Sequence, residues 1–197
     1  MCNFFYFSLL QVLKNMRLSI IFIIIISPLN LLGQNSPIQM INFSQSSKLN
    51  NWRIMNDDVM GGVSKSDLVI NQQGHVKFSG EISLDFNGGF ASFRSYNQTF
   101  DVKGFSKILV HLKGDKKKYQ IRIKENNSDY FSYVNTFKSS GKWETIELSL
   151  VDFMPSYRGR ILNLANFSGN RIDQIGVLIG NKKNEEFELI IDKFTLE

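Results

Sequence analysis

The chain has 197 residues, of which 43% are hydrophobic, 21% charged and 13% aromatic, and its formal net charge is +5. This composition is typical of a globular protein and excludes a disordered, collagen-like or coiled-coil chain. The single cysteine, Cys2, excludes a scaffold stapled by disulfides and a zinc site built from several thiolates.

Segment 1–33 predicts a secretory signal peptide. Its only charged residues, Lys14 and Arg17, precede the almost entirely apolar run 18–32, and cleavage is expected at the end of the segment. A start at Met16 gives the same pattern. The alternative is an uncleaved membrane anchor, although the 15-residue run is shorter than the roughly 20 residues that span a bilayer. We therefore expect an exported protein, periplasmic or secreted, whose only membrane contact is this segment if it stays attached.

The rest of the chain predicts a short linker, 34–37, and one domain, 38–197, because no internal repeat or low-complexity tract divides it. Loss of segment 1–33 lowers the formal net charge to +3 and removes the cysteine. The remaining basic residues are interspersed with acidic ones, and the lysine run 116–118 lies in a predicted turn. A nucleic-acid partner is therefore not expected.

Alternation of apolar and polar residues predicts about nine or ten short strands, separated by turns rich in Asn, Asp and Gly. The clearest strands are 76–81, 108–113, 119–124, 130–137, 143–150, 175–179 and 187–196. Helical periodicity is weak and is best at 150–157, where we expect a turn or two. The expected fold class is all-β, an antiparallel β-sandwich or barrel.

The sequence does not indicate catalysis, a cofactor or catalytic residues. Its only histidines, His75 and His111, are expected on exposed strand or loop positions, and no serine lies in a nucleophile elbow. The adjacent Asp57 and Asp58 diverge in an extended segment, so they do not form the carboxylate pair of a glycosidase. We expect a non-enzyme, and a glycan-active hydrolase is the least favoured reading.

Two stretches stand out, 52–64 and 86–94. In the first, Asn56, Asp57 and Asp58 suit a tight turn or a hard cation, and a glycine pair follows that permits positive φ or close backbone approach. Trp52, Val59 and Met60 are expected to anchor this loop in the core.

The second stretch is a glycine turn that enters a strand. The candidate ligand-binding residues of the two stretches are Asn56, Asp57, Asp58, Asn87 and Arg94. Their alternative role is purely structural, because all of them are ordinary turn or loop residues.

These stretches resemble the signature of the complex I intermediate-associated protein family (NADH:ubiquinone oxidoreductase intermediate-associated domain). The matching residues are Asn-Asp-Asp-Val-Met-Gly-Gly-Val-Ser at 56–64, Phe-Ser-Gly-Glu-Ile-Ser at 78–83 and Asn-Gly-Gly-Phe-Ala-Ser-Phe-Arg at 87–94. Later landmarks, such as Trp143 and the closing segment 187–194, agree as well.

The resemblance implies a galactose-binding-domain-like β-sandwich of jelly-roll type and a non-catalytic role in assembling a respiratory or envelope complex, with a protein partner. Carbohydrate binding is the alternative, with a glycan as partner, because sugar rings stack on exposed aromatic faces. The candidates for such stacking are Tyr130, Tyr133, Tyr157 and Trp143. Trp143 opens a predicted strand and is expected in the core.

Overall fold

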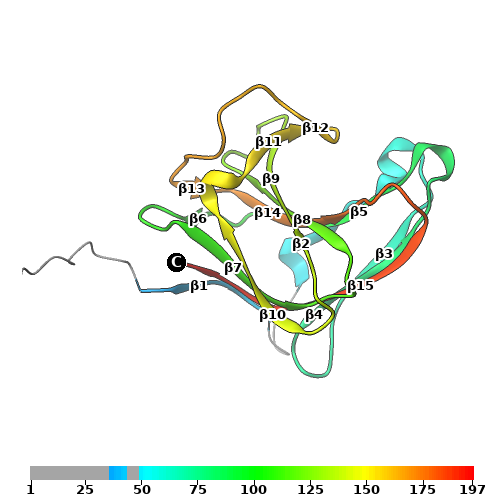
Figure 1. Cartoon of the computed structure of the whole chain (residues 1–197), viewed down its shortest axis with the longest axis horizontal. Helices are drawn as coiled ribbons and strands as arrows, with labels where there is room; N and C mark the ends of the chain where they lie inside the picture. The colour runs from blue at the N-terminus through cyan, green and yellow to red at the C-terminus, as the bar shows by residue number, and fades with distance from the viewer. Residues whose placement is uncertain (1–35, 44–48) are drawn as a thin grey trace, which may run out of the picture. The chain divides into compact units, whose positions relative to one another are not determined.

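The computed structural model describes residues 36–43 and 49–197, which belong to one compact unit covering 34–197. The described part is built from packed antiparallel β-sheets and contains no α-helix (Figure 1). This confirms the all-β, antiparallel sandwich expected from the sequence. The predicted signal segment 1–33 and the first two linker residues lie outside the described residues, so both stay predictions. No described helix has the length and apolar character needed to cross a membrane.

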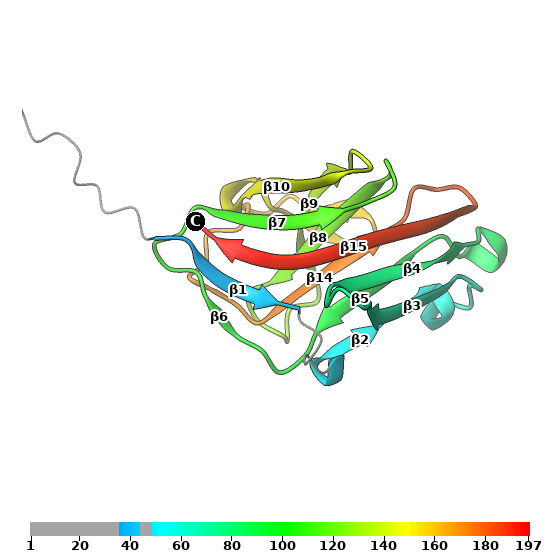
Figure 2. The same ribbon diagram turned by 90° about the horizontal axis from the view of Figure 1, so that it is seen from below.

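The first sheet has six strands in the order β10-β7-β15-β4-β3, with β1 also paired to β15 (Figure 2). The long strand β15 pairs with β7 along one edge, while β4 and β1 share its other edge. The strands of this sheet are β1 (Ile38–Asn42), β3 (Lys65–Ile70), β4 (Val76–Ile82), β7 (Lys107–Lys113), β10 (Trp143–Ser149) and β15 (Glu185–Leu196).

The second sheet has seven strands in the order β12-β11-β9-β8-β14-β5-β2. A separate pair of two-residue strands, β6 (Phe100–Asp101) and β13 (Arg171–Ile172), lies outside both sheets. The strands of the seven-stranded sheet are β2 (Trp52–Ile54), β5 (Ala91–Ser95), β8 (Lys118–Lys124), β9 (Ser132–Lys138), β11 (Met154–Tyr157), β12 (Arg160–Ile161) and β14 (Gln174–Ile179).

Four 3₁₀ helices interrupt the strands: η1 (Leu49–Asn51), η2 (Asp57–Met60), η3 (Asp85–Asn87) and η4 (Leu150–Asp152). The helical turn expected at 150–157 is confined to η4, and strand β11 takes the rest. Pro155 explains the correction, because proline disfavours helical dihedrals in the preceding residue and cannot donate to a helix itself.

The core lies between the two sheets and is rich in phenylalanine. Side chains alternate along each strand, so that Tyr119, Ile121 and Ile123 of β8 are buried while the residues between them face outward. The Phe78 ring of the six-stranded sheet contacts the Phe93 ring of the seven-stranded sheet, with centroids 4.9 Å apart. Such pairs join the two layers without any cysteine.

All seven strands that the sequence predicts most clearly are present, as β4, β7, β8, β9, β10, β14 and β15. The sequence did not predict β1, β2 or β3, nor the two-residue strands. Strand β3 shows why: its inward residues, such as Leu68, are only half buried, and its outward residues include Val69, so its alternation is weak.

Candidate functional site

The Asp57 carboxylate is the centre of the loop formed by the first signature stretch. The residue is completely buried. Oδ1 accepts the main-chain N–H of Ser64 at 3.0 Å, and Oδ2 accepts the Ser64 hydroxyl. The main-chain N–H groups of Gly89 and Phe90 also donate to Oδ2, at 2.6 and 3.2 Å. Asp57 therefore ties the first signature stretch to the second, and we call this arrangement the Asp57 latch.

The latch keeps Asp57 ionised. Burial by itself raises the pKa of the carboxyl, but the hydrogen bonds from Ser64, Gly89 and Phe90 outweigh it and hold the pKa below its usual value. A hard cation would have to displace these donors, so the latch does not suit the cation considered from the sequence. No group of three or more His, Cys, Asp or Glu residues in the described ranges is arranged to hold a metal ion.

Two glycines of the signature are explained by the space around the latch. A Cβ on Gly62 would lie 2.4 Å from both Cγ and Oδ1 of Asp57, so any side chain there would displace the carboxylate. Gly61 has φ of +89° and open space around it, so its requirement is conformational. The Gly-Gly pair thus combines one close approach with one left-handed backbone position.

The latch presents a patch of apolar side chains to solvent. Val59 and Met60, which we expected to anchor the loop in the core, are 61% and 57% exposed, so that expectation was wrong. Only Trp52 packs against the core. We define the apolar tip as the exposed apolar residues of the two latched turns: Val59, Met60, Val63, Leu84 and Phe86.

The two halves of the apolar tip are held side by side. The Ser83 N–H donates to the Ser64 hydroxyl at 3.0 Å, so the segment that carries Val63 is tied to the segment that carries Leu84. Both ribbon views show η2 and η3, the short coils that follow β2 and precede β5, next to each other at one end of the sandwich (Figures 1 and 2).

Phe86 is the most exposed large apolar residue of the tip, at 72%. Its φ and ψ are 54° and 37°, a left-handed conformation that is costly for an aromatic residue, and Asn87 follows with φ of 61°. The surrounding hydrogen bonds therefore hold an exposed ring in a strained position, which is a feature of functional sites.

The remaining predicted residues divide into two groups. Asn56 accepts a hydrogen bond from the Ser66 hydroxyl at 2.8 Å and lies beside the latch, while Asp58 and Asn87 are exposed at the tip. Arg94 lies elsewhere, on the outer face of the seven-stranded sheet, where β14 pairs with β5. The structure thus brings four of the five candidates together around the apolar tip.

Trp143 is also misplaced by the sequence analysis. Instead of lying in the core it is 42% exposed, and it contacts both histidines of the chain, His111 by stacking at 5.0 Å and His75 edge-on at 4.8 Å. Asp192 lies 2.9 Å from His111 Nδ1 and 3.9 Å from His75 Nε2. The Trp143, His75 and His111 rings and the Asp192 carboxylate thus form one cluster on the outer face of the six-stranded sheet.

The tyrosines considered for sugar stacking lie at another end of the seven-stranded sheet. Tyr130 and Tyr157 contact each other with centroids 5.3 Å apart and are 64% and 39% exposed. Tyr133 is only partly exposed, because it packs edge-on against Phe167.

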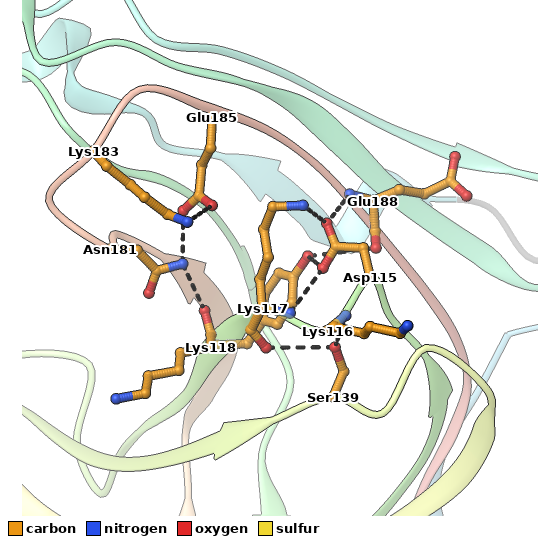
Figure 3. Close-up of polar contacts among 10 residues, drawn as sticks. Asp115, Lys116, Lys117, Lys118, Ser139, Asn181, Lys183, Glu185 and Glu188 are labelled. Atoms are coloured by element: carbon orange, nitrogen blue, oxygen red, sulfur yellow. Dashed lines mark hydrogen bonds and ion pairs between the residues drawn. The ribbon is translucent and has the colours of Figure 1, made fainter.

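The turn that carries the lysine run 116–118 is fixed by its own polar network (Figure 3). The Asp115 carboxylate accepts hydrogen bonds from Lys117 Nζ, from the Tyr119 hydroxyl and from the Glu188 N–H, at 2.6, 2.8 and 3.0 Å. The Ser139 hydroxyl accepts the Lys116 N–H. One lysine of the run is therefore already paired, which agrees with a structural turn.

An open groove of about 580 Å³ borders this turn, on the outer face of β3, β4 and β15. Five of its lining residues are acidic: Asp67, Glu81, Asp115, Glu186 and Glu188. It adjoins the first signature stretch, because Lys65 and Ser66 line it and the Ser66 hydroxyl donates to Asn56. Its Asp115 is committed to the network above.

Sequence reasoning missed Val63, Leu84 and Phe86 as surface residues, and it missed Arg122 as a neighbour of Arg94. A signal for the first group was present, because apolar residues that sit between turn-forming Asp and Gly residues belong to no alternating strand. Arg122 occupies the outward phase of the predicted strand 119–124, but only cross-strand register places it opposite Arg94.

Residues 41–191 match the family model described as Complex I intermediate-associated protein 30 (CIA30). The chain is also 27% identical to the probable complex I intermediate-associated protein 30, mitochondrial, of Caenorhabditis briggsae, over 76% of this chain and 51% of that protein. The chain therefore spans about half the length of the curated relative it matches.

Among solved structures, the fold is similar to the family 11 carbohydrate-binding module of the cellulosomal cellulase Lic26A-Cel5E of Clostridium thermocellum. The TM-score is 0.60 at 18% identity, and the match covers 82% of this chain and 94% of the module. The same module in complex with a β-1,3-1,4-mixed-linked tetrasaccharide gives a TM-score of 0.56 at 18% identity, over 81% and 94% of the two chains. At this identity the likeness establishes the β-sandwich fold alone.

Proposed function

The chain belongs to the Complex I intermediate-associated protein 30 family, and from this premise we propose that it is a non-catalytic binding module that helps assemble a respiratory membrane-protein complex. The observation that carries the proposal is the apolar tip. The family's most specific stretch buries its aspartate and exposes its valine and methionine. If the sequence were selected for folding alone, burying the valine and methionine side chains would make the protein more stable.

The apolar tip has the properties of a protein-docking surface. Phe and Met are enriched at protein interfaces, and contiguous exposed apolar side chains on a single chain mark interaction sites. The latch fixes the two turns before binding, so little conformational entropy is lost when a partner docks.

The tip also restricts the chemistry of its partner. Asp58 and Asp85 are exposed beside Val59 and Phe86, so the rim of the tip is acidic. We propose a protein partner with an apolar pocket that receives Phe86 and Met60, bordered by basic side chains.

The test is complementation of a strain that lacks the gene. The variant Met60→Ser/Phe86→Ser should restore markedly less assembled complex I on native gels than the wild type does. Val151→Ser/Ile161→Ser, which makes the same change at residues that are 64% and 57% exposed outside the tip, should restore the wild-type amount. A photoreactive residue at position 86 should cross-link to a subunit of the complex. Full assembly by the tip variant, or equal loss in both variants, would refute the proposal.

Carbohydrate binding is the second candidate, and the exposed Tyr130–Tyr157 pair is the observation that favours it. Flat apolar rings beside polar groups are the elements of a sugar site. Binding on a glycan array that is lost in Tyr130→Ala and retained in Met60→Ser/Phe86→Ser would establish this function instead of docking.

Export stays part of the proposal, because the segment that predicts it lies outside the described residues. N-terminal sequencing of the protein from an envelope fraction should show cleavage near residue 33. An intact N-terminus in the membrane fraction would indicate the anchor, and recovery from the cytosol would rule out export.

A further inference from the structure

A row of cations crosses the outer face of the seven-stranded sheet. Arg53 of β2 is in register with Arg94 of β5, Arg94 with Gly176 of β14, and Gly176 with Arg122 of β8. Lys124 lies one outward position further along β8. Because neighbouring strands lie about 4.8 Å apart, the Cα atoms of Arg94 and Arg122 are separated by about 10 Å. The four basic residues come from three strands that are distant in sequence.

Gly176 makes this arrangement possible. A Cβ at this position would lie 2.5 Å from the main-chain oxygen of Phe93 and 3.0 Å from the Cβ of Arg94. A side chain would therefore push β5 away and occupy the face between the two arginines. With glycine at position 176, the outer face between β5 and β8 stays open to the guanidinium groups of Arg94 and Arg122.

The row lacks a counter-charge among the described residues. No Asp or Glu in the described ranges forms an ion pair with Arg53, Arg94 or Arg122. Arg122 Nη1 donates only to the neutral amide oxygen of Gln120, at 3.2 Å. Lys124 donates to the main-chain oxygen of Asp129. Arg94 and Arg122 are nevertheless half buried, a position in which an unpaired charge is unfavourable.

The positive charges act on one another. Burial lowers the pKa of Arg122, and the charge of Arg94 lowers it further. The pKa of Lys124 is likewise lowered by burial and by the charges of Arg94 and Arg122, against an opposing effect of Asp129. An anionic ligand would relieve this repulsion, which gives the free protein a built-in preference for negative charge.

We propose that the outer face of the seven-stranded sheet is a second binding site, which takes an acidic segment of a protein through carboxylates held by Arg94 and Arg122. The planar guanidinium groups suit carboxylates, because each can donate two parallel hydrogen bonds. Arg53, whose guanidinium lies 4.9 Å over the Tyr96 ring, extends the row to the sheet edge.

A protein segment fits this face better than a sugar chain does. Strands β2, β5, β8 and β14 place no aromatic residue at an outward position, since Trp52, Phe93 and Tyr119 all face the core. The outward residues around the arginines include the polar side chains Gln120 and Gln174, together with the apolar Leu178 of β14. The face thus offers hydrogen-bond donors, and the Tyr96 ring at its edge is already covered by the Arg53 guanidinium.

The arginine row and the apolar tip share no residue, so the two proposed sites can be tested separately. Failure of the wild-type protein to bind the acidic peptide, with complex assembly intact, would therefore refute only the site described here. Loss of assembly in the tip variant would leave it unaffected.

The experiment measures binding of a fluorescein-labelled oligoglutamate peptide to the full-length chain by fluorescence anisotropy. Arg94→Gln/Arg122→Gln should lower the affinity by at least about tenfold, since each lost bond joins charged groups. The control Lys65→Gln/Lys113→Gln removes the same charge from exposed positions of the six-stranded sheet and should bind like the wild type. Affinity should also fall as salt rises.

The double variant could bind less peptide because it is partly unfolded, which a lower melting temperature would reveal. In that case Arg53→Gln provides a second test, because Arg53 is exposed on the edge strand. It should lower the affinity a few-fold with an unchanged melting temperature. Absence of wild-type binding, or equal affinity in the arginine and lysine double variants, would overturn the proposal. Tighter binding of polygalacturonate than of oligoglutamate through the same arginines would overturn it in favour of an acidic glycan.

Discussion

Ser64 donates both its main-chain N–H and its hydroxyl to the carboxylate of Asp57, seven residues earlier in the chain. The same hydroxyl accepts the N–H of Ser83, so this one serine connects the first signature turn to the second. The Asp57–Ser64 pair therefore sets the geometry of the apolar tip, and its energetic role can be measured.

Asp57→Asn should lower the free energy of unfolding by about 3 kcal/mol at neutral pH. The amide of Asn keeps the size of the side chain but faces main-chain donors with an NH₂ group, and hydrogen bonds to a charged acceptor contribute about 1.5–3 kcal/mol each. Urea unfolding followed by tryptophan fluorescence measures the loss. Asp58→Asn, the exposed neighbour, should change stability by less than about 0.5 kcal/mol, and equal effects in the two variants would contradict the latch.

The loss of folding stability at acidic pH should depend on Asp57. Its folded-state pKa is depressed, so its contribution is complete above the pKa of an unfolded aspartate, about 3.9, and is lost as pH falls through the folded value. The wild-type unfolding free energy should thus fall below about pH 4, and Asp57→Asn should reduce that slope. Urea titrations from pH 7 to pH 2 test this, and an identical slope in both proteins would assign the acid sensitivity to other carboxyls.

Gly62→Ala should be much more destabilising than Gly61→Asn. The new Cβ at position 62 meets the Asp57 carboxylate at 2.4 Å and must displace it, with a cost of about 2–4 kcal/mol. Asn tolerates the left-handed dihedrals of position 61 and has open space there, so its cost should stay below about 1 kcal/mol. Thermal unfolding ranks the two, and the reverse order would mean that backbone conformation outweighs the close approach.

Phe86→Asn should weaken partner binding without lowering the stability of the fold. Asn adopts left-handed dihedrals more easily than Phe, and the ring is 72% exposed, so the variant should be as stable as the wild type or up to about 1 kcal/mol more stable. Partner docking should weaken, because the ring is the largest apolar group of the tip. Calorimetry and cross-linking measure the two effects, and a clear loss of stability would show that the ring supports the fold.

Asp115→Ala should destabilise the protein by about 2–3 kcal/mol without changing the signature turns. The substitution removes four hydrogen bonds, two of them from Lys117, and leaves the buried Tyr119 hydroxyl with only the distant Glu188 carbonyl, at 3.4 Å. Burial and the Asp115 charge raise the pKa of Tyr119, so the hydroxyl stays a donor that needs an acceptor. Tyr119→Phe in the Asp115→Ala background should recover part of the loss, and no recovery would mean that the other three bonds dominate.

The sequence predicted the long strands because each has one inward face, as in the Tyr119-Ile121-Ile123 series of β8. It could not predict β12 or β13, because two residues are too short to show alternation. Trp143 was expected in the core because it opens a predicted strand, although its phase is that of the outward residues Thr145 and Glu147.

The candidate site was predictable in composition and not in arrangement. The residue types at 56–62 indicated a turn correctly, since Asp57 and the glycine pair have clear local chemistry. The hydrogen bond from Gly89 to Asp57, 32 residues away, depends on how the two sheets bring the stretches together. Arg94 and Arg122 are likewise placed on one face only because β14 pairs with both of their strands, and β14 begins more than 50 residues after Arg122 in the chain.

The six-stranded sheet cannot be completed before strand β15 is present. This strand is the shared neighbour of β1, β4 and β7, and it follows all three in the chain. Until residues 185–196 have left the ribosome, those strands have unpaired edges and the Phe78 ring lacks its Phe187 neighbour. The six-stranded sheet therefore forms only after β15 has been synthesised, through contacts that are distant in sequence and slow to form. Until then, the unpaired strand edges of the nascent chain are exposed to aggregation.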